Sequence, residues 1–113
     1  MTLNEYQEEA MRTASGIGGA CAENLMLNGV IGLNGEAGEA IDIVKKHMFQ
    51  GHELDREHLA LELGDCLWYI ATCAEGIGYT LNEIGEMNKA KLRARYPEGF
   101  AVGKSTNRAN GDI

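Results

Sequence analysis

The scarcity of proline is the feature that most constrains the fold of this chain. Pro97 is the only proline among 113 residues, and proline is the residue that most strongly interrupts a helix. No alternating apolar and polar pattern of the kind that marks a strand persists for more than a few residues. The sequence therefore predicts an all-α domain whose helices extend to about residue 95.

Capping residues mark the first and third expected helices. The first begins after Thr2, whose hydroxyl forms a capping box with Glu5, and a glycine-rich run at residues 16–19 ends it. Asp55 is the expected N-cap of the third helix, which reaches about residue 77. Both helix starts are thus predicted from side-chain oxygens that accept hydrogen bonds from free backbone N–H groups.

The second expected helical region, from about residue 20 to 49, contains glycine at every third position of one stretch. These glycines are Gly29, Gly32, Gly35 and Gly38. Each internal glycine costs about 1 kcal/mol relative to alanine. Either the helix breaks near Asn34, or close approach of another backbone compensates, and the sequence leaves both arrangements open.

The end of the chain contains a fourth expected helix and a tail. Thr80 and Glu83 form a second capping box, and the helix that follows them ends near Arg95. Residues 101–113 are polar and contain glycine and asparagine, so we expect a flexible C-terminal tail or a late-ordering lid there. Residues 1–100 are accordingly assigned to one domain.

Two acidic signatures, 26 residues apart, lie inside apolar helical stripes. Each has one acid, two other residues and a second acid: Glu36 with Glu39, and Glu62 with Asp65. At about 100° per residue, the first acid of each pair shares its direction with apolar residues one or two turns away. Such a pair is common on a solvated helix face, so one pair alone is weak evidence. The duplication on two apolar stripes favours a shared interior.

Four carboxylates that face a bundle interior require a neutralising cation. They would repel one another and lose hydration, which costs several kcal/mol per buried ion. The simplest cation is a hard divalent metal bound by oxygen ligands. Mg²⁺ keeps coordination positions for water and phosphate oxygens, so the site suits phosphoryl chemistry, and a triphosphate fits better than a monoester. The pattern predicts Glu36, Glu39, Glu62 and Asp65 as metal ligands.

Other side chains are candidates for substrate contact. Asn88, Lys91 and Arg95 lie along one face of the fourth expected helix and can bind phosphate oxygens, although cations at a helix C-terminus also complement the helix dipole. Lys46 lies on the same helix edge as the second acid of the first pair, within reach of a phosphate. Trp68, the only tryptophan, can stack on a nucleobase or act as a packing anchor.

Charge and cysteine content restrict the partner and the compartment. The net charge is −7, with ten Lys and Arg against seventeen Asp and Glu, which argues against a general nucleic-acid binder because backbone phosphates require clustered cations. Three cysteines without a C-x-x-C pair are expected to be reduced core thiols. No signal peptide or membrane-length apolar run is visible. We expect a cytoplasmic protein without nucleic-acid or membrane partners.

Three segments together resemble a known family. They are GLNGEAGEAIDIVKKH at residues 32–47, LELGDCLWYI at 61–70 and MNKAKLRARYPEGF at 87–100. They resemble the MazG-like nucleoside triphosphate pyrophosphohydrolases of the all-α NTP pyrophosphatase superfamily. The E-x-x-E and E-x-x-D arrangement of that family matches the two acid pairs of this chain position by position.

The resemblance implies a four-helix-type bundle that is completed by dimerisation or tetramerisation. It implies hydrolysis of (deoxy)nucleoside triphosphates to a nucleoside monophosphate and pyrophosphate, with water attacking at the α-phosphate, in a role such as nucleotide-pool clean-up. Mg²⁺, or Mn²⁺ in its place, would bind the four acids. Glu39 is the candidate that orients or deprotonates the water, and Asn88, Lys91 and Arg95 gain weight as phosphate contacts.

A second hypothesis comes from a different class of protein. The chain would then be a non-catalytic, metal-stabilised helical module for oligomerisation or nucleotide sensing. All four acids are intact in this sequence, which favours the enzyme over the module.

Overall fold

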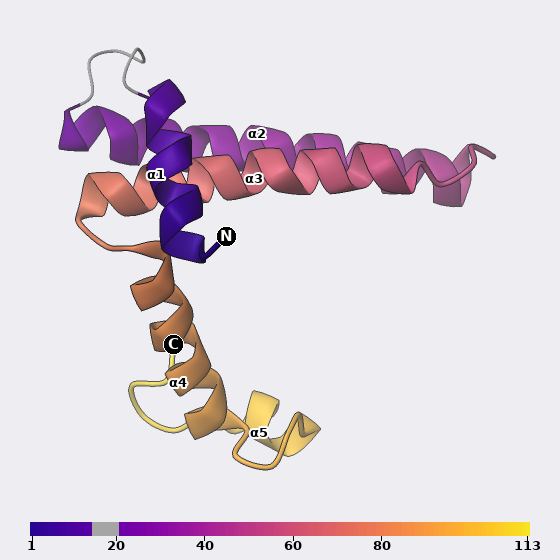
Figure 1. The fold of residues 1–113 in the computed structure, drawn as a ribbon. Coiled ribbons are helices and arrows are strands. Elements are labelled where there is room, and N and C mark those ends of the chain that lie inside the picture. The colour runs from indigo at the N-terminus through magenta and orange to yellow at the C-terminus, as the bar shows by residue number, and fades with distance from the viewer. Residues whose placement is uncertain (15–20) are drawn as a thin grey trace. The chain divides into compact units, whose positions relative to one another are not determined.

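The computed structural model of the chain describes residues 1–14 and 21–113. Within these residues it has five α-helices and no β-strand, which confirms the all-α prediction (Figure 1). The helices are α1 (Leu3–Ala14), α2 (Ala22–Phe49), α3 (Arg56–Ile77), α4 (Leu81–Arg95) and α5 (Val102–Thr106). No helix in this part of the chain combines the length and apolar character needed to cross a membrane. The glycine-rich run predicted to end the first helix lies outside the described residues.

The chain divides into two compact units, Met1–Leu81 and Asn82–Ile113. The first unit contains α1, α2 and α3, and therefore both acid pairs. The second unit contains nearly all of α4, together with α5 and the residues around it. The predicted domain boundary at residue 100 stays a prediction.

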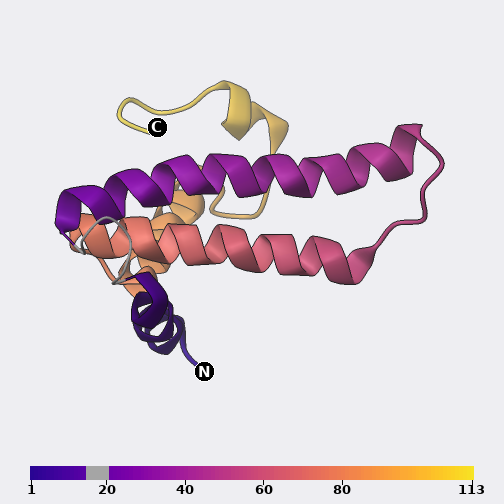
Figure 2. The ribbon, with the colours of Figure 1, turned by 90° about the horizontal axis from the view of Figure 1, so that it is seen from above.

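An antiparallel hairpin of α2 and α3 forms the body of the first unit (Figures 1 and 2). The hairpin loop includes Gly51, whose φ of 74° lies in the left-handed region that favours glycine. Asp55 Oδ1 accepts a hydrogen bond of 2.9 Å from the His58 N–H, so the predicted N-cap of α3 is confirmed. The helix ends at Gly78, which is also left-handed with a φ of 80°.

The helix α2 is continuous, and α3 packs closely against two of its glycines. The helix runs for 28 residues, so the break that the sequence permits near Asn34 does not occur. A Cβ atom added at Gly29 would lie 2.6 Å from the backbone nitrogen of Cys73, and one at Gly32 would lie 2.1 Å from the Tyr69 ring. The two later glycines of the series meet nothing within 4 Å. Close approach therefore compensates for the glycines in the first half of the series.

The helix α1 is attached to the end of α3 through one buried glutamine. Gln7 Nε2 donates to Glu75 Oε2 at 2.9 Å and to the Tyr79 carbonyl oxygen at 3.0 Å. Its Oε1 accepts from the Leu81 N–H at 2.6 Å. Because both ends of the buried amide have partners, the contact orients α1 without leaving an unpaired polar group.

The predicted capping box at the start of α1 is confirmed. The Glu5 N–H donates to Thr2 Oγ1 at 3.1 Å, and the Thr2 N–H donates to Glu5 Oε2 at 3.2 Å. These reciprocal bonds satisfy donors that the first turn of a helix leaves free. The helix start is therefore a local consequence of residues 2–5.

In the second unit, the segment after α4 folds back toward that helix. Gly99 and Gly111 have φ values of 94° and 84°, so both turns use the left-handed region. The Arg95 side chain then pairs with the carboxylate of Asp112. Residues 101–113, expected to be a flexible tail, thus contain a short helix and an ion pair, and their mobility stays a prediction.

All three cysteines are free, in agreement with the expectation of reduced thiols. Cys66 and Cys73 are half-buried. Cys21 is exposed, so its predicted core position is wrong. The physical reason is its place at the N-cap of α2, before the helix and its packed face begin.

The glycine contacts predict opposite effects of alanine at two positions of α2. Gly29→Ala is expected to lower the free energy of unfolding by about 1–3 kcal/mol, because the new Cβ meets the α3 backbone and the helices must separate. Gly38→Ala places its Cβ in open space and is expected to be neutral or to stabilise by up to about 1 kcal/mol. Urea denaturation of both variants measures the difference, and equal effects would contradict the packing described here.

Candidate functional site

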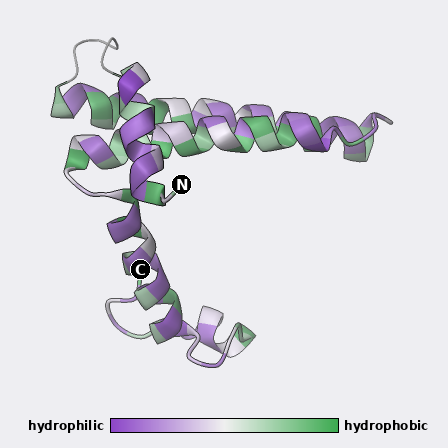
Figure 3. Cartoon of the chain, in the orientation of Figure 1, coloured by the Kyte–Doolittle hydropathy of each residue, from purple (hydrophilic) through white to green (hydrophobic). Residues whose placement is uncertain are grey.

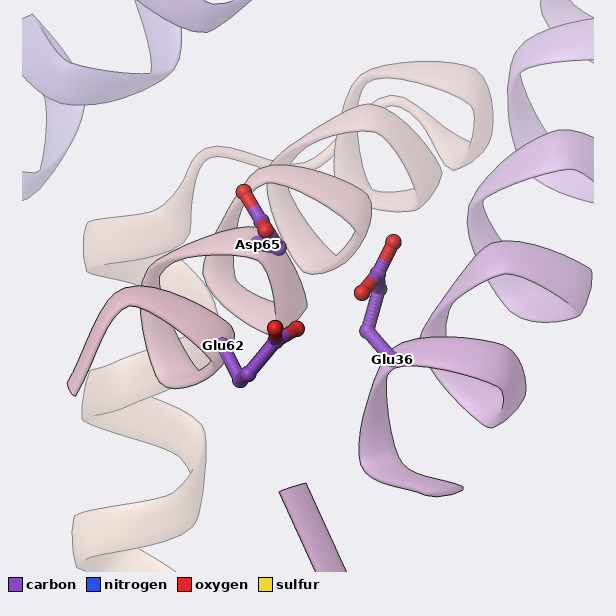
Figure 4. Close-up of side chains that lie close together, drawn as sticks. All are labelled: Glu36, Glu62 and Asp65. Atoms are coloured by element: carbon purple, nitrogen blue, oxygen red, sulfur yellow. The ribbon is translucent and has the colours of Figure 1, made fainter. Parts of the chain in front are cut away.

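Three carboxylates from α2 and α3 meet in the first unit. Glu36 reaches from α2 toward Glu62 and Asp65, which lie one turn apart on α3 (Figure 4). One oxygen of each side chain lies within 4.8 Å of the other two. The helix hairpin thus brings together acids from both predicted pairs, which we call the acid cluster.

Glu62 is the most buried member of the acid cluster, with only 7% of its surface exposed. Its Oε1 lies 3.0 Å from His58 Nε2. Its Oε2 is buried and has no hydrogen-bond donor among the described residues. A buried carboxylate oxygen without a donor is unfavourable unless a cation compensates for it. This oxygen, next to two further carboxylates, fits the oxygen-ligand chemistry of a divalent metal.

The pKa of Glu36 is raised above its ordinary value. Loss of hydration on burial is the largest cause, followed by the closeness of the Glu62 carboxylate and by the negative charges of Asp65 and Glu39. Each of these effects disfavours the ionised carboxylate. A bound divalent cation acts in the opposite direction, because it stabilises the ionised form. A metal ion at this position would therefore compete with protons for the Glu36 carboxylate.

Glu39 stands outside the group of three clustered carboxylates. It is exposed and lines a cavity of about 1010 Å³ together with Glu62 and Lys46. Lys46 Nζ pairs with Asp42 at 2.8 Å within the same cavity wall. The sequence predicts that Glu39 and Lys46 lie on the same edge of the helix, and both residues line this cavity. A metal contact of Glu39 and a phosphate contact of Lys46 stay predictions.

Two residues of this cavity received no role from the sequence. Asp42 pairs with Lys46 and Lys45, and these hydrogen bonds hold its pKa below the ordinary value. His58 contacts Glu62 on α3. Helical spacing carried a signal for both residues, since Asp42 precedes Lys46 by four residues and His58 precedes Glu62 by four.

Trp68 acts as a packing anchor in this chain. Its indole Nε1 donates to Thr13 Oγ1 of α1 at 3.0 Å, and its ring meets Tyr69 edge-on with the centroids 5.0 Å apart. It is not among the described residues that line the acidic cavity. Of the two interpretations open at the sequence level, the anchor has structural support, and base stacking stays a prediction.

The three polar residues predicted on one face of α4 line two different cavities of the second unit. Lys91 and Arg95 line one of about 460 Å³. Asn88 lines another of about 550 Å³, together with Arg93. Arg95 is already engaged by the carboxylate of Asp112. Contact of these residues with phosphate stays a prediction.

Comparisons with known proteins agree with this arrangement. A family model described as the MazG nucleotide pyrophosphohydrolase domain matches residues 27–100. The Gene 37 protein of Mycobacterium phage L5 is 35% identical over 82 residues, which cover 69% of this chain and 72% of the phage protein. No solved structure matches the chain. The matched segment contains both acid pairs and all of the hairpin except the first five residues of α2, and the chain belongs to the MazG nucleotide pyrophosphohydrolase family.

Proposed function

We propose that this protein is a Mg²⁺-dependent hydrolase that converts (deoxy)nucleoside triphosphates to a nucleoside monophosphate and pyrophosphate. The observation that carries the proposal is the buried carboxylate of Glu62, which has one oxygen without a donor and clusters with Glu36 and Asp65. Membership of a family described as nucleotide pyrophosphohydrolases supplies the reaction class. Removal of non-standard or surplus nucleotides in the cytoplasm is the proposed role, and the free cysteines fit that reducing compartment.

Glu36, Glu62 and Asp65 would hold the metal, with Mn²⁺ able to replace Mg²⁺. A divalent ion there supplies charge neutralisation for phosphate oxygens and a lowered pKa for bound water. His58 contributes indirectly, because its contact engages Glu62 Oε1 and leaves Oε2 as the oxygen without a hydrogen-bond partner. In this proposal Glu62 connects the metal ligands to the cavity, because it belongs both to the acid cluster and to the residues that line the cavity.

Glu39 is the proposed general base. Its exposed carboxylate lines the cavity beside Glu62, where it can accept a proton from a water molecule. The water oxygen forms a bond to the α-phosphorus, the bond from that phosphorus to the oxygen bridging the β-phosphate breaks, and pyrophosphate leaves with the bonding electrons. Lys46, oriented by Asp42, faces the same cavity and would neutralise phosphate oxygens.

We also propose that two or more copies of the chain complete a four-helix-type bundle. Apolar residues remain exposed along both helices of the hairpin (Figure 3). They include Val30 at 55%, Ile31 at 63%, Leu61 at 64% and Leu63 at 58% exposure. A pair of long helices cannot cover its own outer apolar surface, and another helical layer of the same kind would do so. A homodimer or homotetramer is the proposed state.

Activity is the first test. With Mg²⁺ and a panel of nucleoside triphosphates, chromatography should resolve monophosphate and pyrophosphate, and EDTA should abolish both. Glu39→Gln and Glu62→Gln should each lower turnover by about 10²–10⁴-fold, because an amide neither accepts the proton nor supplies a charged ligand. Glu57→Gln, an exposed position on the same helix as Glu62, is the matched control and should retain activity.

The outcomes of this assay separate the hypotheses. Diphosphate and phosphate as products would mean a different phosphohydrolase. A metal-dependent rise in melting temperature without turnover of any nucleotide would instead support the non-catalytic helical module. Unfolding of both glutamine variants, measured by circular dichroism, or undiminished turnover would contradict the assigned roles.

Metal binding should depend on pH in a defined direction. Because the folded-state pKa of Glu36 is raised above its ordinary value of 4.5, its contribution to metal-free stability is present below about that pH and is lost as the pH rises through the folded pKa. Mg²⁺ at about 100 times its dissociation constant should restore about 2.7 kcal/mol, and this gain should shrink on acidification. Thermal unfolding in EDTA and in Mg²⁺ between about pH 4 and 8 measures both trends, with Glu36→Gln as the variant whose metal-free curve is flatter.

Oligomerisation is tested by sedimentation. The native chain should sediment as a dimer or tetramer, and Ile31→Lys should shift it toward the monomer because a charge on the covered face must be desolvated. Glu9→Lys introduces the same side chain at an exposed position of α1 and should leave the oligomer intact. A native chain that is monomeric at high micromolar concentration would refute this part of the proposal.

A further inference from the structure

A basic cavity lies in the second unit, largely in the segment that follows the family match. Lys91 and Arg95 of α4 line it together with Lys104 and Arg108, and the one side-chain carboxylate among its lining residues belongs to Asp112. The Ile113 backbone oxygen also accepts a hydrogen bond of 3.2 Å from the Arg95 guanidinium group. The family model ends at residue 100, so it accounts for only two of the four cations. In a chain with a net charge of −7, such a concentration of positive charge indicates an anionic ligand.

Asp112 already occupies the guanidinium group of Arg95. Arg95 Nε donates to Oδ2 at 2.7 Å, and a terminal guanidinium nitrogen donates to Oδ1 at 2.5 Å. The two side chains are only 10% and 17% exposed. This two-pronged geometry uses the same guanidinium edge that a phosphate group binds through two oxygens. Asp112 and a phosphate therefore exclude each other at this edge of Arg95.

The neighbouring turn places the Asp112 carboxylate in the cavity. Gly111 has a φ of 84°, and the Asp112 N–H donates to the Ala109 carbonyl oxygen at 3.1 Å. The pKa of Asp112 is lowered, first by the hydrogen bonds from Arg95 and further by the positive charges of Arg108 and Lys91. An anion at this position thus lies in the field of several cations at once.

We propose that the basic cavity binds the polyphosphate chain of a nucleotide, and that Asp112 is an internal anion which the polyphosphate displaces. This inference rests on the proposed function, which supplies a nucleoside triphosphate as the ligand. It assigns Lys91, Arg95, Lys104 and Arg108 as contacts within the second unit and makes Asp112 a competitor of the polyphosphate in this cavity. The apparent affinity for the polyphosphate is expected to be lower than that of a cavity without Asp112, because only the fraction of molecules with Arg95 released can bind.

Calorimetric titration of the full chain with inorganic tripolyphosphate in EDTA tests the site apart from hydrolysis and apart from the metal. The native chain should bind, and Arg108→Gln should weaken binding by about tenfold because a charge-assisted contact is lost. Arg93→Gln is the matched control, since Arg93 is exposed in the same unit and is not among the residues lining this cavity. Equal losses in both variants would overturn the site and leave only nonspecific charge attraction.

Displacement is tested by releasing Asp112 in two ways. Asp112→Asn should tighten tripolyphosphate binding by about three- to tenfold, because the competing ion pair is lost. Gly111→Ala keeps the carboxylate but strains the left-handed turn that presents it, and it should also tighten binding. Glu98→Gln, an exposed acid outside the cavity, controls for net charge and should leave the affinity unchanged.

A direct readout is the Arg95 Nε–H signal in nitrogen-15 NMR spectra. Tripolyphosphate and Asp112→Asn should each move this signal away from its position in the free native chain. Unchanged affinity in both Asp112→Asn and Gly111→Ala, or absence of tripolyphosphate binding in every variant, would overturn the inference. Nucleotide hydrolysis together with those results would leave the proposed function intact, whereas tripolyphosphate binding without hydrolysis would refute the proposed function and keep the anion site.

Discussion

The close approach of α2 and α3 at two glycines is the constraint on which the acid cluster depends. A Cβ at Gly32 would overlap the Tyr69 ring, so these positions face each other in the antiparallel hairpin. Four residues forward on α2 is Glu36, and four residues back on α3 is Asp65. Since both helices rise 1.5 Å per residue, the register fixed at the glycine brings these two acids to the same level. The remaining acid of each pair, Glu39 on α2 and Glu62 on α3, lies three residues further from the glycine contact.

This packing holds together groups that repel one another. The carboxylate of Glu62 is buried with one oxygen lacking a donor, and the pKa of Glu36 is raised by burial and by its acidic neighbours. Helix contacts outside the cluster must outweigh this repulsion in the metal-free chain, and the Gly29 contact together with the buried Gln7 amide supplies such contacts. The divalent cation of the proposed function would relieve repulsion that the fold already contains.

The sequence predicts the features that depend on neighbouring residues, and it does not predict those that depend on residues far apart in the chain. The helix starts at Thr2 and Asp55 follow from side chains three residues or fewer from the N–H groups they accept from. The continuity of α2 does not, because the energetic effect of Gly29 depends on α3 packing against it. The same holds for Trp68, whose partner lies 55 residues away in the chain, and for the pairing of Arg95 across 17 residues.

An internal anion such as Asp112 also sets the affinity that a ligand must exceed in order to bind in the basic cavity. A single phosphate group that displaces Asp112 from Arg95 exchanges one two-pronged contact for another and gains little, because both ligands are oxygen anions of similar geometry. A polyphosphate chain replaces the same contact and adds new ones to Lys104 and Arg108, which line the same cavity. The cavity discriminates between the two ligands by the difference between their affinities. Because Asp112 competes with both, only the ligand with the additional contacts displaces it. The segment beyond the family match would therefore favour nucleotides with two or more phosphates over the monophosphate product.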